Sequence, residues 1–374
     1  MPKPYLVSAR QITIMTTLFT VGSAILIIPS GMASVAKQDA WIAALAGLGG
    51  GVLLVALYNA ISSWYPRMSL IGILEKLLGK WPGKVVSLLF VATWFVITPG
   101  ATLYYLGNFM TTQIMPETPI KAINVLFILI VVMGIRLGIE TIARAAELLF
   151  PWCMLLFAAL VALVMTELEP VKALPVMEAG LSPIWPSALS FTCTVFVPQL
   201  SLFLFLPPSM NHTREGRKGL LIGSLTGGAM IAVIVALSIL VLGPQITGRS
   251  IYPSYSLAKK ISIGNFLQRI ESFMAVLWII TLYFRVTLYL YAISSALGQI
   301  LQLKDYRPVV LPLGMITVVL SIVNYPNVPF EQTWDTKTWI PFAITTGIVL
   351  PLLLVGVHLI RKGTGKIGTK NKKI

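Results

Sequence analysis

The chain has 374 residues, of which 56% are hydrophobic and 11% charged, and its mean hydropathy is +0.85. Soluble domains carry about 25% charged residues, so this composition excludes a soluble protein and indicates one that crosses a membrane several times. The formal net charge of +15 would suggest a nucleic-acid partner in a soluble protein. Here the basic residues fall in loops and in the tail, so the partner they indicate is the lipid bilayer, and no nucleic acid is expected.

No residue pattern indicates catalysis, a metal or a cofactor. Cys153 and Cys193 both lie inside apolar segments, so they form neither a disulfide framework nor a metal-binding spacing. His212 and His358 are far apart in the sequence, and it contains no serine–histidine–aspartate, nucleotide-binding or zinc motif. We therefore expect a protein that is not an enzyme and that uses no metal and no cofactor.

Ten apolar segments are long enough to cross a bilayer, for which a helix needs about 20 residues. A shorter stretch at 70–80 combines apolar and charged residues at helical spacing, which predicts a helix lying in the membrane interface. The ten predicted spans cover residues 11–30, 40–62, 84–111, 121–139, 144–166, 184–207, 218–243, 270–300, 308–325 and 338–360.

The spans divide into two halves of five around the loop at 167–183. An odd number of spans in each half forces the second half to insert upside down, which is the inverted-repeat arrangement of several transporter folds. We thus predict an all-α membrane protein with one integral membrane domain over residues 1–374. Its first repeat covers about 11–166, its second about 184–360, and a basic tail follows at 361–374.

Lysine and arginine are unevenly distributed between the two sides of the membrane. With the N-terminus inside, 19 of the 28 lysine and arginine residues fall in inner segments or in the tail, and 8 fall in outer loops. Cytoplasmic loops carry an excess of these residues. Both termini are therefore predicted to face the cytoplasm.

The first span is interrupted near its centre. It contains the helix-weak pair Gly22-Ser23, then Ala24 and Ile25, and later Pro29. In lipid such a break is tolerated only where the freed backbone groups find partners in protein or in a wet cavity, and carriers use broken helices to hold small charged substrates. The alternative is that the glycine only lets a neighbouring helix pack closely.

The first span of the second half is interrupted at the matching place. Thr192, Cys193 and Thr194 put small polar groups just before Pro198, and threonine hydroxyls can satisfy the carbonyls that a proline frees. Two interruptions at corresponding positions point to a binding site at mid-membrane. We expect the first and sixth spans to be broken helices that hold a small molecule between them.

Arg285 stands about halfway along the eighth span, and an arginine at this depth has to face the bundle and find a partner. Either it meets a substrate carboxylate or replaces a bound cation, or backbone carbonyls of the broken helices hold it. The structural and electrostatic role is favoured, because an arginine cannot lose its proton in a transport cycle. Thr287 and Tyr291 lie on a different face; which face lines a cavity is left open by the sequence, and we assign Thr287 to the site.

The third span carries a proline at position 99, which predicts a kink. Trp94 and Thr98 share one face of this span and suit the wall of a small pocket, although an ordinary core stripe gives the same pattern. No aspartate or glutamate is expected at mid-depth in any span. This argues against a proton-driven pump, which usually carries a carboxylate or histidine there.

Five groups of residues form a pattern that extends over essentially the whole chain. They are the glycine-broken first span ending in Pro29, Asp39-Ala40-Trp41-Ile42, Tyr65-Pro66 with Ser69-Leu70, the run from Ile73 to Lys80, and Arg269-Ile270-Glu271-Ser272 with Trp278 and Phe284-Arg285. This pattern resembles the B subunits of endospore germinant receptors, also called spore germination permeases, of the amino acid–polyamine–organocation transporter superfamily. Many relatives carry a lysine where this chain has Arg285, so that position departs from the family pattern.

The resemblance implies a LeuT-like five-plus-five inverted repeat, with a pocket between spans one, three, six and eight for a small germinant, commonly an amino acid. It also implies assembly with an A-type membrane subunit and a C-type lipoprotein in the spore inner membrane. The expected function is to sense a germinant and to signal to these partner subunits. The alternatives are an amino acid carrier, coupled to protons or sodium and acting alone, and a channel-forming interaction subunit without a ligand.

The interruptions and the resemblance together predict one set of site residues. Their small, apolar side chains suggest a ligand such as alanine or valine. The predicted ligand-binding residues are Gly22, Ser23, Ala24, Ile25, Trp94, Thr98, Thr192, Cys193, Thr194 and Thr287, and the predicted structural and electrostatic core is Arg285, Pro29 and Pro198.

Overall fold

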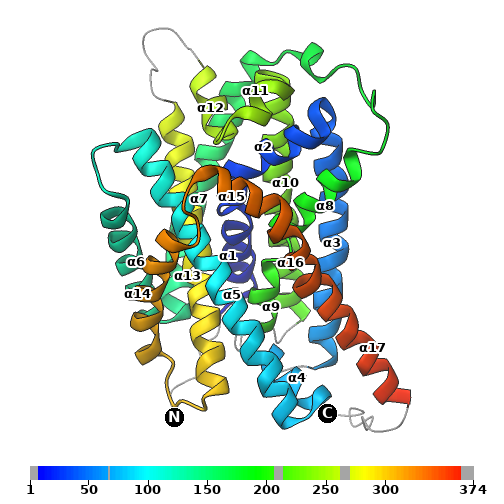
Figure 1. Ribbon diagram of the computed structural model, residues 1–374, viewed down its shortest axis with the longest axis vertical. Coiled ribbons are helices and arrows are strands. Elements are labelled where there is room, and N and C mark those ends of the chain that lie inside the picture. Colours follow the sequence, from blue (N-terminus) through cyan, green and yellow to red (C-terminus); the bar gives the residue numbers. More distant parts are fainter. Residues whose placement is uncertain (1–6, 66–67, 206–213, 262–269, 364–374) are drawn as a thin grey trace.

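The computed structural model describes residues 7–65, 68–205, 214–261 and 270–363, and these residues form helices and connecting turns without a strand (Figure 1). The last two residues of the predicted sixth span and most of the predicted basic tail lie outside the described residues. The first half consists of α1 Ala9–Val21, α2 Ala24–Ala36, α3 Ala40–Trp64, α4 Leu70–Leu78, α5 Lys80–Phe109 with a π-helical turn Met110–Ile114, α6 Ile120–Leu137 and α7 Ile139–Val164.

The second half also contains a helix that is interrupted early. Two π-helical turns, Asp335–Trp339 and Thr345–Val349, join its last three helices into one continuous rod. The helices are α8 Ile184–Val195, α9 Gln199–Phe205, α10 Arg214–Leu242, α11 Pro244–Arg249, α12 Pro253–Lys260, α13 Glu271–Ile300, α14 Arg307–Val323, α15 Val328–Trp334, α16 Ile340–Ile344 and α17 Leu350–Gly363.

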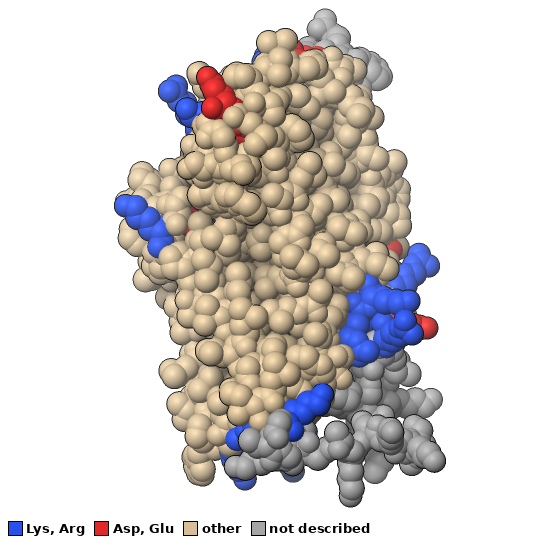
Figure 2. All heavy atoms as spheres, turned by 90° about the vertical axis from the view of Figure 1, so that its right-hand side faces the viewer, with Lys and Arg blue, Asp and Glu red and all other residues tan. Residues whose placement is uncertain are grey.

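The long helices are apolar and expose large hydrophobic side chains, including Leu53, Leu126 and Trp152, as lipid-facing helices do. In the described part of the chain, seven helical segments are long and apolar enough to cross a membrane. The remaining predicted spans correspond to the helix α14 and to the interrupted helices α1–α2 and α8–α9. That the chain crosses the membrane ten times stays a prediction. Most of the face in Figure 2 is uncharged, and Lys and Arg are more numerous toward its lower end.

Glycines let the broken helices pack closely against unbroken ones. On α10, a Cβ at Gly223 would lie 2.5 Å from the carbonyl oxygen of Thr13, and one at Gly227 would lie 2.6 Å from Cβ of Thr20, so α1 rests directly on the α10 backbone. On α3, a Cβ at Gly47 would lie 2.7 Å from the carbonyl oxygen of Ala188 in α8. Such close contacts between small residues are the usual way in which membrane helices associate, and here they fix the position of both interrupted helices.

The predicted interfacial helix is present as α4, which buries Leu70, Ile73 and Leu74 on one face. It ends at Gly79, whose φ of +102° is readily adopted only by glycine. That α4 lies in the interface stays a prediction.

The last span begins ten residues earlier than the sequence predicted, at residue 328 instead of 338. Asn327 caps the helix, because its side-chain oxygen accepts a hydrogen bond of 2.9 Å from the backbone N–H of Phe330. Pro329 lies in the first turn, where the missing N–H costs nothing. The stretch at 328–337, which lay outside the predicted span, is therefore part of the helix.

The lower end of this last helix is held by aromatic and backbone contacts. His358 of α17 stacks on Trp64 with ring centroids 4.4 Å apart, and its Nδ1 lies 2.6 Å from the hydroxyl of Tyr65. Arg361 donates a hydrogen bond of 3.1 Å to the carbonyl oxygen of Lys76 in α4. The rod α15–α17 thus runs from a level below α11 and α12 to the lower end of the molecule (Figure 1).

Candidate functional site

The first interruption lies between α1 and α2 and depends on a glycine. Gly22 ends α1 with φ +24° and ψ −128°, a conformation that L side chains rarely adopt. A Cβ at this position would overlap Cδ of Arg285 and lie 2.8 Å from the carbonyl oxygen of Phe19. Glycine is therefore needed both for the backbone turn and for the arginine side chain that crosses it.

The second interruption, between α8 and α9, is a turn at residues 196–198 held by a buried polar network. The N–H groups of Phe196 and Val197 both donate to the carbonyl oxygen of Thr192, at 3.0 and 3.3 Å. Gln199, fully buried, donates from Nε2 to the hydroxyl of Thr20 at 2.9 Å and accepts a hydrogen bond from Ser224. This network ties the second interruption to the end of α1.

The guanidinium of Arg285 lies between the two interruptions. Its Nη1 atom is 3.5 Å from the carbonyl oxygens of both Phe19 and Thr20, and its Nη2 atom is 3.3 Å from the carbonyl oxygen of Thr194. These carbonyls lie in the last turns of α1 and α8, where a helix carries partial negative charge. Arg285 thus contacts both helix ends; its structural and electrostatic role stays a prediction.

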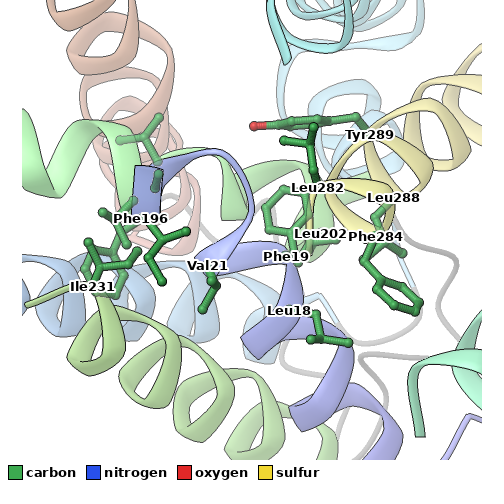
Figure 3. Close-up of a cluster of buried hydrophobic side chains, with 14 of the residues drawn as sticks. Leu18, Phe19, Val21, Phe196, Leu202, Ile231, Leu282, Phe284, Leu288 and Tyr289 are labelled. Atoms are coloured by element: carbon green, nitrogen blue, oxygen red, sulfur yellow. The ribbon is translucent and has the colours of Figure 1, made fainter. Parts of the chain in front are cut away.

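Aromatic rings hold the same guanidinium from the side. Its central carbon is 5.4 Å from the ring centroid of Phe19 and 5.7 Å from that of Tyr289, within the range of a cation–π interaction. The two rings meet edge to face with centroids 5.0 Å apart, and Figure 3 shows them close to Leu282. Because all its hydrogen bonds are long and its buried Nε atom has none, Arg285 keeps unused donor capacity.

A cavity of about 330 Å³ extends from the interruptions toward the upper end of the molecule. Its walls come from α2, α5, α8, α13, the α11 region and the upper part of the rod α15–α17. Ser23 and Arg285 line it beside the interruptions, and Ser34 and Gly248 line it where α2 meets α11. By the predicted topology α11 lies on the outer side of the membrane, which predicts that the cavity is directed outward.

Five predicted site residues line this cavity, namely Ser23, Ala24, Thr98, Thr194 and Arg285. Ser23 precedes the first turn of α2 and makes no capping hydrogen bond with its side chain, so the free N–H groups of that turn lack a side-chain acceptor. Thr98 uses its hydroxyl to donate to the carbonyl oxygen of Trp94 at 2.8 Å. Thr194 accepts a hydrogen bond of 3.1 Å from the indole of Trp339.

Other predicted residues lie behind the cavity wall and do not line it. Thr192 donates to the carbonyl oxygens of Gly47 and Ala188, so its hydroxyl joins α8 to α3. The carbonyl oxygen of Ile25 accepts a hydrogen bond of 2.5 Å from Ser254. The remaining residues outside the lining are Gly22, Pro29, Trp94, Cys193, Pro198 and Thr287.

The assignment of Thr287 to the cavity differs from the structure. The cavity-lining face of α13 is that of Arg285 and Tyr289, which are four residues apart, whereas Thr287 is fully buried and absent from the lining. Two residues along a helix correspond to a rotation of about 200°, so Arg285 and Thr287 cannot share a face. Contacts with the two helix ends, which the sequence of α13 alone does not reveal, decide which face is turned inward.

Two carboxylates that sequence reasoning placed outside the membrane core also line the cavity. Glu331 and Asp335 lie one turn apart on the rod α15–α17 and line the cavity; the expectation that no acidic residue lies at mid-depth of a span stays a prediction. Glu331 is 5% exposed and Asp335 accepts a hydrogen bond of 2.7 Å from the hydroxyl of Tyr105. The available signal was the capping residue Asn327 followed by Pro329, which starts the helix early enough to carry both carboxylates inward.

Comparison with known proteins places this sequence in a family. The family model described as "Spore germination protein" matches residues 6–328. Spore germination protein KB of Bacillus subtilis (strain 168) is 33% identical over 325 residues, covering 86% of this chain and 86% of that protein. Spore germination protein YndE of the same organism is 24% identical, with 95% of this chain and 97% of that protein covered.

Solved structures of transporters share the fold. MhsT in complex with L-phenylalanine superimposes with a TM-score of 0.62 at 15% identity, covering 96% of this chain and 99% of that one. Mhp1, a nucleobase-cation-symport-1 family transporter in a closed conformation with bromovinylhydantoin bound, gives 0.64 at 14% identity, covering 94% and 78%. The predicted fold class, an all-α LeuT-like membrane protein, is thus confirmed, while the side of the termini stays a prediction. By its sequence, the chain belongs to the spore germination protein family.

Proposed function

We propose that this chain is the germinant-sensing membrane subunit of a spore germinant receptor, and that it binds a small amino-acid-like germinant in the cavity between its interrupted helices. The observation that carries the proposal is the convergence of α2's free first turn and the buried, incompletely bonded guanidinium of Arg285 on one outward-directed cavity. A helix N-terminus and a cation both attract a carboxylate. The family membership supports the role in germination.

In this proposal the germinant's carboxylate lies against the first turn of α2, at Ser23 and Ala24, with Thr98 and Thr194 on the facing walls. Gly22 makes the site possible by leaving room for Arg285. The residues behind the wall, among them Thr192 and Cys193, hold the interruptions in place without touching the ligand. A cavity of about 330 Å³ is of the size that takes small organic ligands.

Signalling requires that the germinant bind one conformation more tightly than another, because a ligand with equal affinity for both shifts nothing. Ligand contacts on both α2 and the rod α15–α17 would supply that difference, since both elements line one cavity. The response would pass to an A-type membrane subunit and a C-type lipoprotein in the spore inner membrane. The two inverted repeats at about 11–166 and 184–360 are part of the same proposal.

A second candidate function is an amino acid carrier coupled to protons or sodium and acting alone. The shared fold of MhsT and Mhp1 favours it, and so do the carboxylates Glu331 and Asp335, because carriers use intramembrane carboxylates for coupling. Counterflow separates the two functions. Proteoliposomes that contain only this chain and exchange labelled amino acid across the membrane would establish the carrier and remove the receptor proposal.

Binding itself is tested on the purified full-length chain in lipid nanodiscs. We expect at least one of the standard amino acids to raise its Tm in a concentration-dependent way, because a ligand that binds only the folded state stabilises it. Isothermal titration then gives the Kd. If no amino acid changes the Tm and none binds by titration, the proposed germinant class is wrong.

A further inference from the structure

Glu331 and Asp335 form an acidic pair in the cavity, and within the described part of the chain no basic residue forms an ion pair with either of them. Glu331 is nine-tenths buried, lines the cavity, and its Oε2 atom has no hydrogen-bond partner. Asp335, one turn further along the rod, accepts one hydrogen bond from Tyr105. A buried carboxylate without a partner is strongly destabilised relative to one in water, so the pair is arranged for a group that arrives from outside the protein.

Aromatic rings surround this pair. The ring of Tyr325 lies 6.2 Å from that of Tyr105 in a stacked arrangement, 5.0 Å from that of Tyr104 and 6.4 Å from that of Trp334. Burial raises the pKa of Tyr325, and the negative charge of Asp335 raises it further, so its phenol stays neutral. Neutral aromatic faces beside carboxylates are the surroundings that stabilise an ammonium group.

The basic residues in reach do not neutralise the acidic pair. Arg285 lines the same cavity, yet no ion pair within 4.0 Å joins it to Glu331 or Asp335, and the hydrogen bonds that its guanidinium makes go to the two helix ends. Lys337, on the same rod, is exposed and forms no ion pair with either carboxylate. The cavity therefore has a guanidinium at the interruptions and two carboxyl groups on the rod α15–α17.

We infer that Glu331 and Asp335, with the rings of Tyr105 and Tyr325, form a second subsite that binds an organic ammonium group. The inference rests on the proposed function, in which the anionic end of the ligand lies at the first turn of α2. It deepens that function by assigning the ligand's cationic end to the last helix. A molecule without a hydrogen-bond donor at this end would leave Glu331 without a partner.

Matched probes test the subsite on the full-length chain in nanodiscs. L-leucine carries both charges, 4-methylpentanoate lacks the ammonium, and 3-methylbutylamine and methylamine lack the carboxylate; potassium chloride and sodium chloride at equal ionic strength represent inorganic cations. The variants are Glu331→Gln, Asp335→Asn, and the matched control Glu117→Gln on an exposed loop. The readouts are the Tm shift and the Kd by titration.

We expect the amines to stabilise the wild type and Glu117→Gln, and 4-methylpentanoate to have a smaller effect than L-leucine. Glu331→Gln should lose the response to amines, and the Kd of any bound amino acid should rise about tenfold or more, with a smaller rise in Asp335→Asn. Glu331→Gln removes an unpartnered charge, so its Tm without ligand should not fall below that of the wild type. That result shows that a lost response is not a folding defect.

Three outcomes would overturn the inference: no amine stabilises the wild type, Glu331→Gln responds to amines as the wild type does, or either inorganic salt stabilises as strongly as the amines. These failures are distinct from failure of the proposed function. If an amino acid binds Glu331→Gln and wild type equally, the subsite is wrong and the germinant site stands. If amines bind and no amino acid does, the subsite stands and the proposed germinant class is wrong.

Discussion

The two interrupted helices look alike in sequence and differ in what they present to the cavity. The first interruption turns on Gly22 and exposes the N-terminal turn of α2 to the cavity. The second turns at 196–198 and directs Thr192 to α3 and Gln199 to α1, so that most of its polar groups are used inside the protein. In the proposed function, the first interruption forms most of the ligand site and the second supports it.

The largest effect of a substitution is expected at Gly22, where the first interruption turns. A leucine there would require an unfavourable positive φ and would displace the side chain of Arg285. We expect Gly22→Leu to abolish the amino-acid-dependent Tm shift and the germination response. The control is Gly49→Leu, because Gly49 is exposed on α3 and a Cβ there meets nothing within 4 Å. A normal response in membrane-inserted Gly22→Leu would contradict the site.

The next largest effect is expected at the residue that both interruptions share. Arg285→Met removes the cation that neutralises the ends of α1 and α8, and we expect a loss of about 3 kcal/mol in the free energy of unfolding together with weaker ligand binding. Unfolding of the purified protein by denaturant in mixed micelles measures the first effect, and titration the second. An unchanged stability would show that the helix ends do not need this charge.

If the second interruption only supports the first, a substitution there should lower the stability of the protein with little effect on ligand binding. Gln199→Leu leaves the hydroxyls of Thr20 and Ser224 without their buried partner, which costs about 2 kcal/mol. The Kd for the amino acid should change much less than in Gly22→Leu, because Gln199 does not line the cavity. Parallel unfolding and titration curves decide the point, and a large loss of affinity at unchanged stability would place Gln199 in the site.

The smallest change is expected at Thr192. The hydroxyl of Thr192 joins α8 to the carbonyl oxygen of Gly47 at 2.9 Å, so Thr192→Val should lower the free energy of unfolding by about 1 kcal/mol without altering the Kd. Thr194→Val provides the contrast one half-turn away, because Thr194 lines the cavity. If the two variants changed the Kd equally, the cavity-lining side of α8 and its opposite side would not differ in their contribution to binding.

Local sequence features predicted the interruptions, since a glycine–serine pair and a proline after small polar residues act on their own stretch of backbone. The helix face of α13 was not predictable in this way, because Arg285 is turned inward by carbonyl groups that lie 265 and 91 residues away in the chain. Glu331 and Asp335 were missed for a different reason. The start of their helix contains proline, and this stretch has the composition of a loop unless Asn327 is recognised as the helix cap.

The rod α15–α17 lines the cavity at its upper end, and at its lower end His358 contacts Trp64 and Tyr65 at the end of α3 while Arg361 donates to the carbonyl oxygen of Lys76 in α4. A helix resists shortening, so a displacement of the segment around Glu331 must tilt or slide the whole rod unless its two π-helical turns absorb it. Such a movement of the whole rod would link the cavity mechanically to the opposite surface of the molecule. No relay of side chains is required for that link, because one covalently continuous backbone makes the connection.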